Sequence, residues 1–146
     1  MQKNDFSSVK FYNLTHPQKR IWYLENIYPG TSLFNVGGPI RIKGTVDFKI
    51  LKKAIDAFIY KNEGMRLRIA KKDNDVKQYI IEYKEVEPVF IDFSVFDRPE
   101  EAFGRWVAEQ AQKPFSLIDN DLFEFSFFKI SNNEYGYLPK FHHIIA

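Results

Sequence analysis

The sequence contains no cysteine, which excludes disulfides, thiolate nucleophiles and cysteine-based zinc sites. An excess of charge is also lacking, because 21 basic residues nearly balance 19 acidic ones and leave a formal net charge of +2. The basic residues are scattered and form no stripe for nucleic acid. No apolar run approaches the roughly 20 residues of a membrane-spanning helix. No apolar stretch typical of a signal peptide follows Met1–Asp5 either. We therefore expect a cytoplasmic protein that binds neither nucleic acid nor membrane.

Two motifs of common enzyme classes are missing as well. No Gly-x-Ser-x-Gly segment is present, so covalent acyl transfer has no evident nucleophile. The pair Gly37-Gly38 is followed neither by Lys-Ser/Thr nor by an early helix, which excludes a phosphate-binding loop. If the protein is a transferase, direct attack by a bound nucleophile is the more natural scheme.

Aromatic residues, by contrast, are abundant. The 146 residues include 15 Phe, 8 Tyr and 2 Trp. Aromatic side chains have a large apolar surface area per residue. Either the core is therefore large, or part of the surface is apolar and binds a partner.

Three segments have the apolar spacing of amphipathic helices. The first begins at Thr15, where a threonine followed three residues later by Gln18 predicts a capping box. Period-two or apolar stretches between the helices predict strands. The expected helices lie within residues 15–29, 47–64 and 97–114, and the expected strands are 36–43, 65–69, 76–83, 89–93, 122–130 and 134–143. This order predicts one layered domain of the α+β or α/β class, with a mixed sheet and about three helices.

The last expected strand ends in two adjacent histidines, His142 and His143. Neighbours on a strand point to opposite faces, so one histidine should face a site and the other the interior. This separation disfavours a shared metal ion, and we expect no metal site. A histidine with its ordinary pKa of about 6.5 is a natural general base. The alternative from the pattern alone is a core histidine that is hydrogen-bonded to the backbone.

Arg66 is a second candidate, expected on the strand face opposite Met65 and Leu67. An exposed arginine there would simply be solvated. A buried one needs an anionic partner, because an unpaired interior charge is costly. The sequence offers no evident carboxylate for it.

Taken together, these stretches resemble the condensation domains of nonribosomal peptide synthetases, from about residue 11 to residue 146. The family's opening motif, Ser/Thr-x-x-Gln-x-Arg-Ile/Leu-Trp-x-Leu, matches Thr15–Leu24. Its second motif, Arg-His-Glu-x-Leu-Arg, is looser at Lys61–Arg66, which puts in doubt the local contacts of its first two residues. Its catalytic signature, His-His-x-x-x-Asp-Gly, matches His142–Ala146 up to the residue before the aspartate.

The resemblance implies a chloramphenicol-acetyltransferase-like fold of two lobes, with the active site in a tunnel between them. Residues 1–146 would form most of the N-terminal lobe and end inside the catalytic signature. An amine on one carrier-bound aminoacyl thioester would attack the thioester carbonyl of the donor to form an amide. The segments Tyr28–Ser32 and Met65–Arg68 are most similar to starter condensation domains of lipopeptide synthetases, which attach a fatty acyl group to the first amino acid. The substrates would be carried on the phosphopantetheine of carrier proteins, with no cofactor bound directly.

The resemblance also implies residue roles. His143 would face the tunnel, either as general base or to position the amine and stabilise the tetrahedral intermediate, and His142 would be structural. Arg66 would pair with the aspartate of the signature, and Gln18 and Arg20 of the opening motif would support the site. Alone, the chain is expected to be inactive and to self-associate through the apolar face that the C-terminal lobe would cover.

Three alternatives stay open. An epimerisation domain shares the double histidine, and a freestanding coenzyme A-dependent acyltransferase shares the fold. The lobe could also be a non-catalytic docking module for carrier proteins, with structural histidines. A heterocyclisation domain is disfavoured, because those domains replace the histidines with aspartate.

Overall fold

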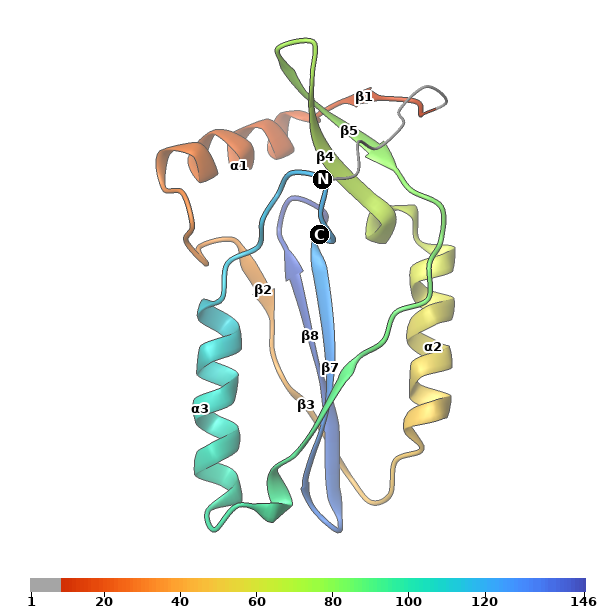
Figure 1. Cartoon of the computed structure of the whole chain (residues 1–146), viewed down its shortest axis with the longest axis vertical. Helices are drawn as coiled ribbons and strands as arrows, with labels where there is room; N and C mark the ends of the chain where they lie inside the picture. Colours follow the sequence, from red (N-terminus) through yellow and green to blue (C-terminus); the bar gives the residue numbers. More distant parts are fainter. Residues whose placement is uncertain (1–8) are drawn as a thin grey trace.

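The computed structural model describes residues 9–146, so Met1–Asp5, on which the signal-peptide interpretation rests, lies outside the described residues. Within residues 9–146 the chain forms two sheets and three α-helices (Figure 1), which confirms the α+β class. Helices α2 and α3 flank the larger sheet, and α1 lies beside the smaller sheet at the end that carries the C-terminus.

The larger sheet has five strands, in the order β2-β8-β7-β6, with β3 also paired to β8. All its pairs are antiparallel except the parallel pair β6–β7. The hairpin β7–β8 forms its centre, as expected from the alternation of the last third of the chain. Its strands are β2 Asn35–Gly37, β3 Ile40–Lys43, β6 Val89–Asp92, β7 Phe123–Ser131 and β8 Glu134–His142.

The expected strand 36–43 is interrupted and forms the two short strands β2 and β3. Gly37 has a φ of 144°, and a Cβ there would lie 2.1 Å from the carbonyl oxygen of Pro139 on β8. Only glycine permits this φ and this approach. Pro139 itself lies in an interior strand, opposite Phe125 on β7, rather than at an edge.

Helix α2, Phe48–Lys61, covers one face of this sheet. The carboxylate of Asp47 accepts hydrogen bonds from the backbone N–H groups of Lys49 and Ile50, which caps the helix as predicted. Its apolar stripe packs against the aromatic face of β7. The buried residues of this core are Ile55, Ile59, Met65, Phe123 and Phe127.

Helix α3, Pro99–Gln112, covers the opposite face and follows the short 3₁₀ helix η2, Phe93–Val95. It begins two residues later than the predicted Asp97. Its core contains Phe93, Ala102, Phe103, Phe128, Ile130 and Leu138.

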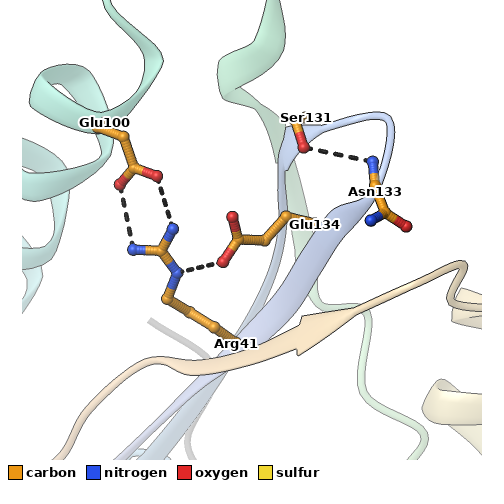
Figure 2. A network of polar contacts seen from close by, with 5 residues as sticks. All are labelled: Arg41, Glu100, Ser131, Asn133 and Glu134. Carbon is orange, nitrogen blue, oxygen red and sulfur yellow. Dashed lines mark hydrogen bonds and ion pairs between the residues drawn. The ribbon is translucent and has the colours of Figure 1, made fainter.

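An arginine on β3 ties this helix to the sheet (Figure 2). The Arg41 guanidinium donates to Glu100 on α3 at 2.6 Å and to Glu134 on β8 at 2.6 Å. These contacts raise the pKa of Arg41, Glu134 contributing most.

The smaller sheet has the order β1-β5-β4 and packs with helix α1. Its hairpin turns at Asp73 and Asn74, both with positive φ, as a two-residue turn between strands requires. A third core joins this sheet to the end of the chain through Leu14, Ile69, Leu117, Leu122 and Ile144. The elements are β1 Tyr12–Asn13, α1 His16–Ile27, β4 Leu67–Lys72 and β5 Asp75–Ile80.

Helix α1 has no fully buried residue. An apolar stripe at i, i+1, i+4 and i+5 is exposed on its last turns and its C-cap residue: Tyr23, Leu24, Ile27 and Tyr28. No helix in residues 9–146 has both the length and the apolar character needed to cross a membrane.

Candidate active site at the end of strand β8

Every second residue of strand β8 faces the interior, and this alternation continues to the last residue of the strand. Gly136, Leu138, Lys140 and His142 are all buried, whereas their neighbours are half-buried. This alternation places Leu138, Lys140 and His142 on the same, interior side of the strand. The backbone N–H of His142 donates to the carbonyl of Leu122 at 2.8 Å. His142 is therefore fixed in the sheet by its backbone as well as by its side chain.

The imidazole of His142 is enclosed, with 2% of the residue exposed. Its Nε2 lies 3.1 Å from a carboxylate oxygen of Glu25 on α1, and its Nδ1 accepts the backbone N–H of Ile144 at 3.2 Å. The rings of Phe34 and Phe115 lie 6.0 and 6.1 Å away between centroids. Burial lowers the pKa of His142 below its ordinary value, and the nearby Glu25 opposes this shift only in part.

Strand β8 ends at His142, one residue before the predicted end, and His143 lies in the turn that follows. Its backbone N–H donates to the carbonyl of Phe34 at 2.8 Å. The residue is exposed, and within residues 9–146 its imidazole makes no hydrogen bond or ion pair. The two histidines are thus separated as expected, with His142 buried and His143 exposed. His143 owes its position to the turn after β8 rather than to the strand itself.

Gln18 connects the start of α1 to this turn. Its side-chain oxygen accepts from the backbone N–H of Thr15 at 2.8 Å, which confirms the capping box. Its side-chain nitrogen donates to Gln78 at 2.8 Å and to the carbonyl of Ile144 at 3.2 Å. Arg20 is exposed, and among the described residues its side chain has no hydrogen bond or ion pair, so the structure does not bring it to the histidines.

Arg66 lies at the end of the 3₁₀ helix η1, Glu63–Arg66, and not on a strand. The strand prediction for this residue was wrong, because β4 starts at Leu67. Its Nη1 donates to the carbonyl of Ile81 at 3.0 Å, but its buried Nε has no partner among residues 9–146. Arg66 lines an open cavity of about 1000 Å³ together with Ile145 and Ala146.

The buried, ion-paired arginine of this region is Arg68 instead. Arg68 is 5% exposed, and its guanidinium contacts the carboxylate of Asp121. Burial lowers the pKa of Arg68. The partner lies 53 residues further along the chain, which sequence spacing alone does not reveal.

Two side chains beside the histidines hold the C-terminal end of helix α3. The amide of Asn35 donates to the carbonyls of Ala111 and Lys113, both at 2.9 Å. The buried ammonium of Lys140 donates to the carbonyl of Lys113 at 3.3 Å and pairs with Glu124 at 2.9 Å. The last carbonyls of a helix need such donors.

Sequence reasoning missed Glu25, Asn35 and Lys140. A signal for Glu25 was present, since it follows Gln18 by seven residues, or two helical turns, and therefore lies on the same helix face. No comparable local signal marks Asn35. Residues 9–146 contain no group of three histidine, aspartate or glutamate side chains arranged to hold a metal ion.

Comparisons with known proteins bear on the family and on the fold. A family model described as Condensation domain matches residues 8–146. Surfactin synthase subunit 1 of Bacillus subtilis (strain 168) is 38% identical over 141 residues, which cover 94% of this chain and 4% of that protein. A plipastatin synthase of the same organism is 33% identical over 135 residues, which cover 92% of this chain and 5% of that protein.

Solved structures show the same fold. The starter condensation domain of the rhizomide synthetase matches with a TM-score of 0.85 and 22% identity, over 92% of this chain and 33% of that one. The first condensation domain of the CDA synthetase matches with a TM-score of 0.80 and 20% identity, over 94% of this chain and 36% of that one. The chain thus spans about a third of the solved chains and a small part of the curated relatives.

Proposed function

The chain belongs to the condensation-domain family, and we propose that in its intact parent it forms part of a site that makes an amide bond. The observation that carries this proposal is the pair of histidines at the end of β8. His142 is buried, and both of its ring nitrogens are hydrogen-bonded. His143, the next residue, is exposed. Such an arrangement supports one imidazole and leaves the other free to meet a substrate.

We propose that residues 9–146 belong to the N-terminal lobe of a two-lobed domain. The chain matches about a third of the solved condensation-domain chains, and 92% of it takes part in the match. A second lobe would supply the other wall of the site. The isolated lobe is therefore expected to be inactive.

The reaction joins a carrier-bound acyl donor to a carrier-bound aminoacyl acceptor. The amine nitrogen of the acceptor bonds to the thioester carbonyl carbon of the donor, and the carbon–sulfur bond breaks. The amine loses a proton, and the departing thiolate gains one. His143 either takes the proton as general base or holds the amine and the tetrahedral intermediate in place. The thioesters would be linked to the phosphopantetheine of carrier proteins, which are the proposed partners.

Arg66 completes the proposed site indirectly. Its buried Nε has no partner in residues 9–146, and a buried unpaired donor on a cation is costly. The cavity that it lines also contains Ile145 and Ala146. We propose that a carboxylate from outside these 146 residues pairs with Arg66, as the family's signature aspartate would.

The proposed donor is a fatty acyl thioester. In support, the fold matches the starter condensation domain of the rhizomide synthetase, and a variant of that domain was solved in complex with C8-CoA and Leu-SNAC. A cytoplasmic location stays a prediction.

Mass spectrometry of the acceptor carrier tests this function. The intact parent domain would be given an acyl-loaded donor carrier and an aminoacyl-loaded acceptor carrier. We expect the acceptor to gain the mass of the acyl group. Exchange of the α-hydrogen with deuterated solvent, without acyl transfer, would indicate an epimerisation domain instead. Transfer only from an acyl-CoA would indicate a freestanding acyltransferase, and binding of carriers without any reaction would indicate a docking module.

A further inference from the structure

Glu25 on helix α1 makes a buried contact with the first histidine of the pair. One of its carboxylate oxygens lies 3.1 Å from Nε2 of His142. The side chains are 11% and 2% exposed, respectively. The contact therefore lies out of water, where a hydrogen bond to a charged acceptor is strong and directional.

The two neighbours of the His142 ring define which nitrogen carries the proton. The backbone N–H of Ile144 donates to Nδ1 at 3.2 Å, so this nitrogen acts as an acceptor and bears no hydrogen. A neutral imidazole then carries its proton on Nε2, which donates to Glu25. Glu25 and Ile144 thus hold one tautomer and one ring orientation from opposite sides.

This ring is bonded into the turn that presents His143. Ile144 is the residue after His143, and its N–H is the group that the ring of His142 holds. The turn is further closed by a bond from the N–H of Ile145 to the carbonyl of His142 at 3.1 Å. A change in the ring's orientation would therefore release the turn beside His143.

We propose that Glu25 is a positioning residue, which orients His142 and through it the turn that presents the imidazole of His143 to substrate. The proposal rests on the proposed function of His143. Glu25 touches neither substrate nor His143 in this scheme. Its effect passes through the bond between His142 and Ile144, because a displacement of about 1 Å at a reacting group costs roughly 100-fold in rate.

Long-range ¹H–¹⁵N spectra of the histidine-labelled chain test this inference directly. The chain contains only three histidines, so three imidazole signals are to be assigned. In the wild type we expect His142 to carry its proton on Nε2. Glu25→Leu removes the acceptor, and we expect a mixture of tautomers and at least about tenfold faster amide exchange at Ile144. Glu25→Gln keeps an oxygen acceptor and should preserve both the tautomer of His142 and the slow amide exchange at Ile144.

Activity of the intact parent provides the second readout. At saturating carrier concentrations, Glu25→Leu should slow amide formation by about 10- to 100-fold with little change in KM, and Glu25→Gln should stay within about threefold of the wild type. A purely structural role would lower the melting temperature but leave the rate of the folded fraction unchanged. If Glu25→Leu does not fold, Glu25→Asp, which withdraws the carboxylate by one methylene, replaces it in both measurements.

Two results would overturn the inference: a wild-type His142 that is protonated on Nδ1, or a folded Glu25→Leu chain with unchanged tautomer and unchanged exchange at Ile144. The protonated nitrogen of His142 and the amide exchange of Ile144 are both measured without a catalysed reaction. They therefore decide the role of Glu25 separately from amide formation by the wild-type parent, which decides the proposed function.

Discussion

The side-chain nitrogen of Gln18 donates a hydrogen bond to the backbone carbonyl of Ile144 over 3.2 Å. The same side chain contacts Gln78 on β5 and closes the capping box with Thr15. One glutamine therefore joins the first turn of α1, the smaller sheet and the turn after the double histidine. The segment that carries His143 is therefore anchored by the first turn of α1.

Substitution of Gln18 should therefore reduce the stability of the whole chain. Gln18→Ala removes a helix cap and two long-range hydrogen bonds, and we expect a loss of about 2 kcal/mol in the free energy of unfolding. Urea denaturation followed by tryptophan fluorescence measures this loss. Arg20→Ala is the matched control on the same helix, because its side chain has no partner among the described residues. Equal losses in the two variants would contradict the anchoring role.

The two arginines that flank Leu67 should differ in their contribution to stability. Arg68 is buried and paired with Asp121, so Arg68→Met should cost about 2–3 kcal/mol in the free energy of unfolding. Arg66 has a buried nitrogen without a partner in residues 9–146, so Arg66→Met should change this free energy by less than about 1 kcal/mol. Chemical denaturation of both variants checks the difference. A large loss in Arg66→Met would mean that the Nε group of Arg66 is already paired within this chain.

The stability of the chain should depend on pH through His142. Burial lowers the pKa of His142 in the folded state, while the unfolded chain keeps the ordinary value of about 6.5. Between these two values the unfolded state binds more protons, so the free energy of unfolding rises with pH. The contribution is fully present above about pH 6.5 and is lost as the pH falls through the folded-state pKa.

Denaturant titrations at about pH 7.5 and pH 5.5 measure this dependence. We expect lower stability at the acidic pH in the wild type. His142→Gln should remove most of the difference, and His16→Gln, a substitution on the exposed surface of α1, should retain it. A wild-type stability that is equal at both values would contradict the buried neutral imidazole.

The exposed apolar stripe on α1 should make the isolated chain self-associate. Tyr23, Ile27 and Tyr28 are 63%, 64% and 55% exposed, which is unusual for adjacent large apolar residues on one helix face. Light scattering over a concentration series should show dimers or larger species. Ile27→Lys should weaken the association by about tenfold or more, which corresponds to about 1.4 kcal/mol. Ile50→Lys, at an equally exposed isoleucine on α2, is the control, and a monomer at every concentration would contradict the prediction.

Local sequence patterns were sufficient for several elements. Thr15 and Gln18 are three residues apart, so their capping box depends only on one helical turn. The alternation along β8 likewise needs only the period of a strand, and it placed His142 in the interior. The exact end of the strand depends on the bond between His143 and Phe34, which lie more than 100 residues apart. The turn at His143 was therefore not predictable from this pattern.

Long-range partners explain the remaining differences. Residues 65–69 alternate as a strand would, yet Met65 and Arg66 continue the 3₁₀ helix after α2. Burial of Arg68 depends on Asp121, and the role of Lys140 depends on the end of α3. These contacts join segments that are distant in the sequence, and no single stretch contains both partners. The candidate site was thus predictable at His142, His143 and Gln18, but not at Glu25, Asn35 and Lys140, whose contacts join distant segments.

The central claim is that His143 meets the substrates while His142 supports it. The most direct measurement is single-turnover amide formation by the intact parent with both carrier proteins loaded in advance. We expect His143→Ala to reduce the rate by at least about 100-fold while the domain keeps the circular dichroism spectrum of the wild type, and His16→Ala to retain the wild-type rate. A folded His143→Ala parent that forms the amide at the wild-type rate would contradict the account.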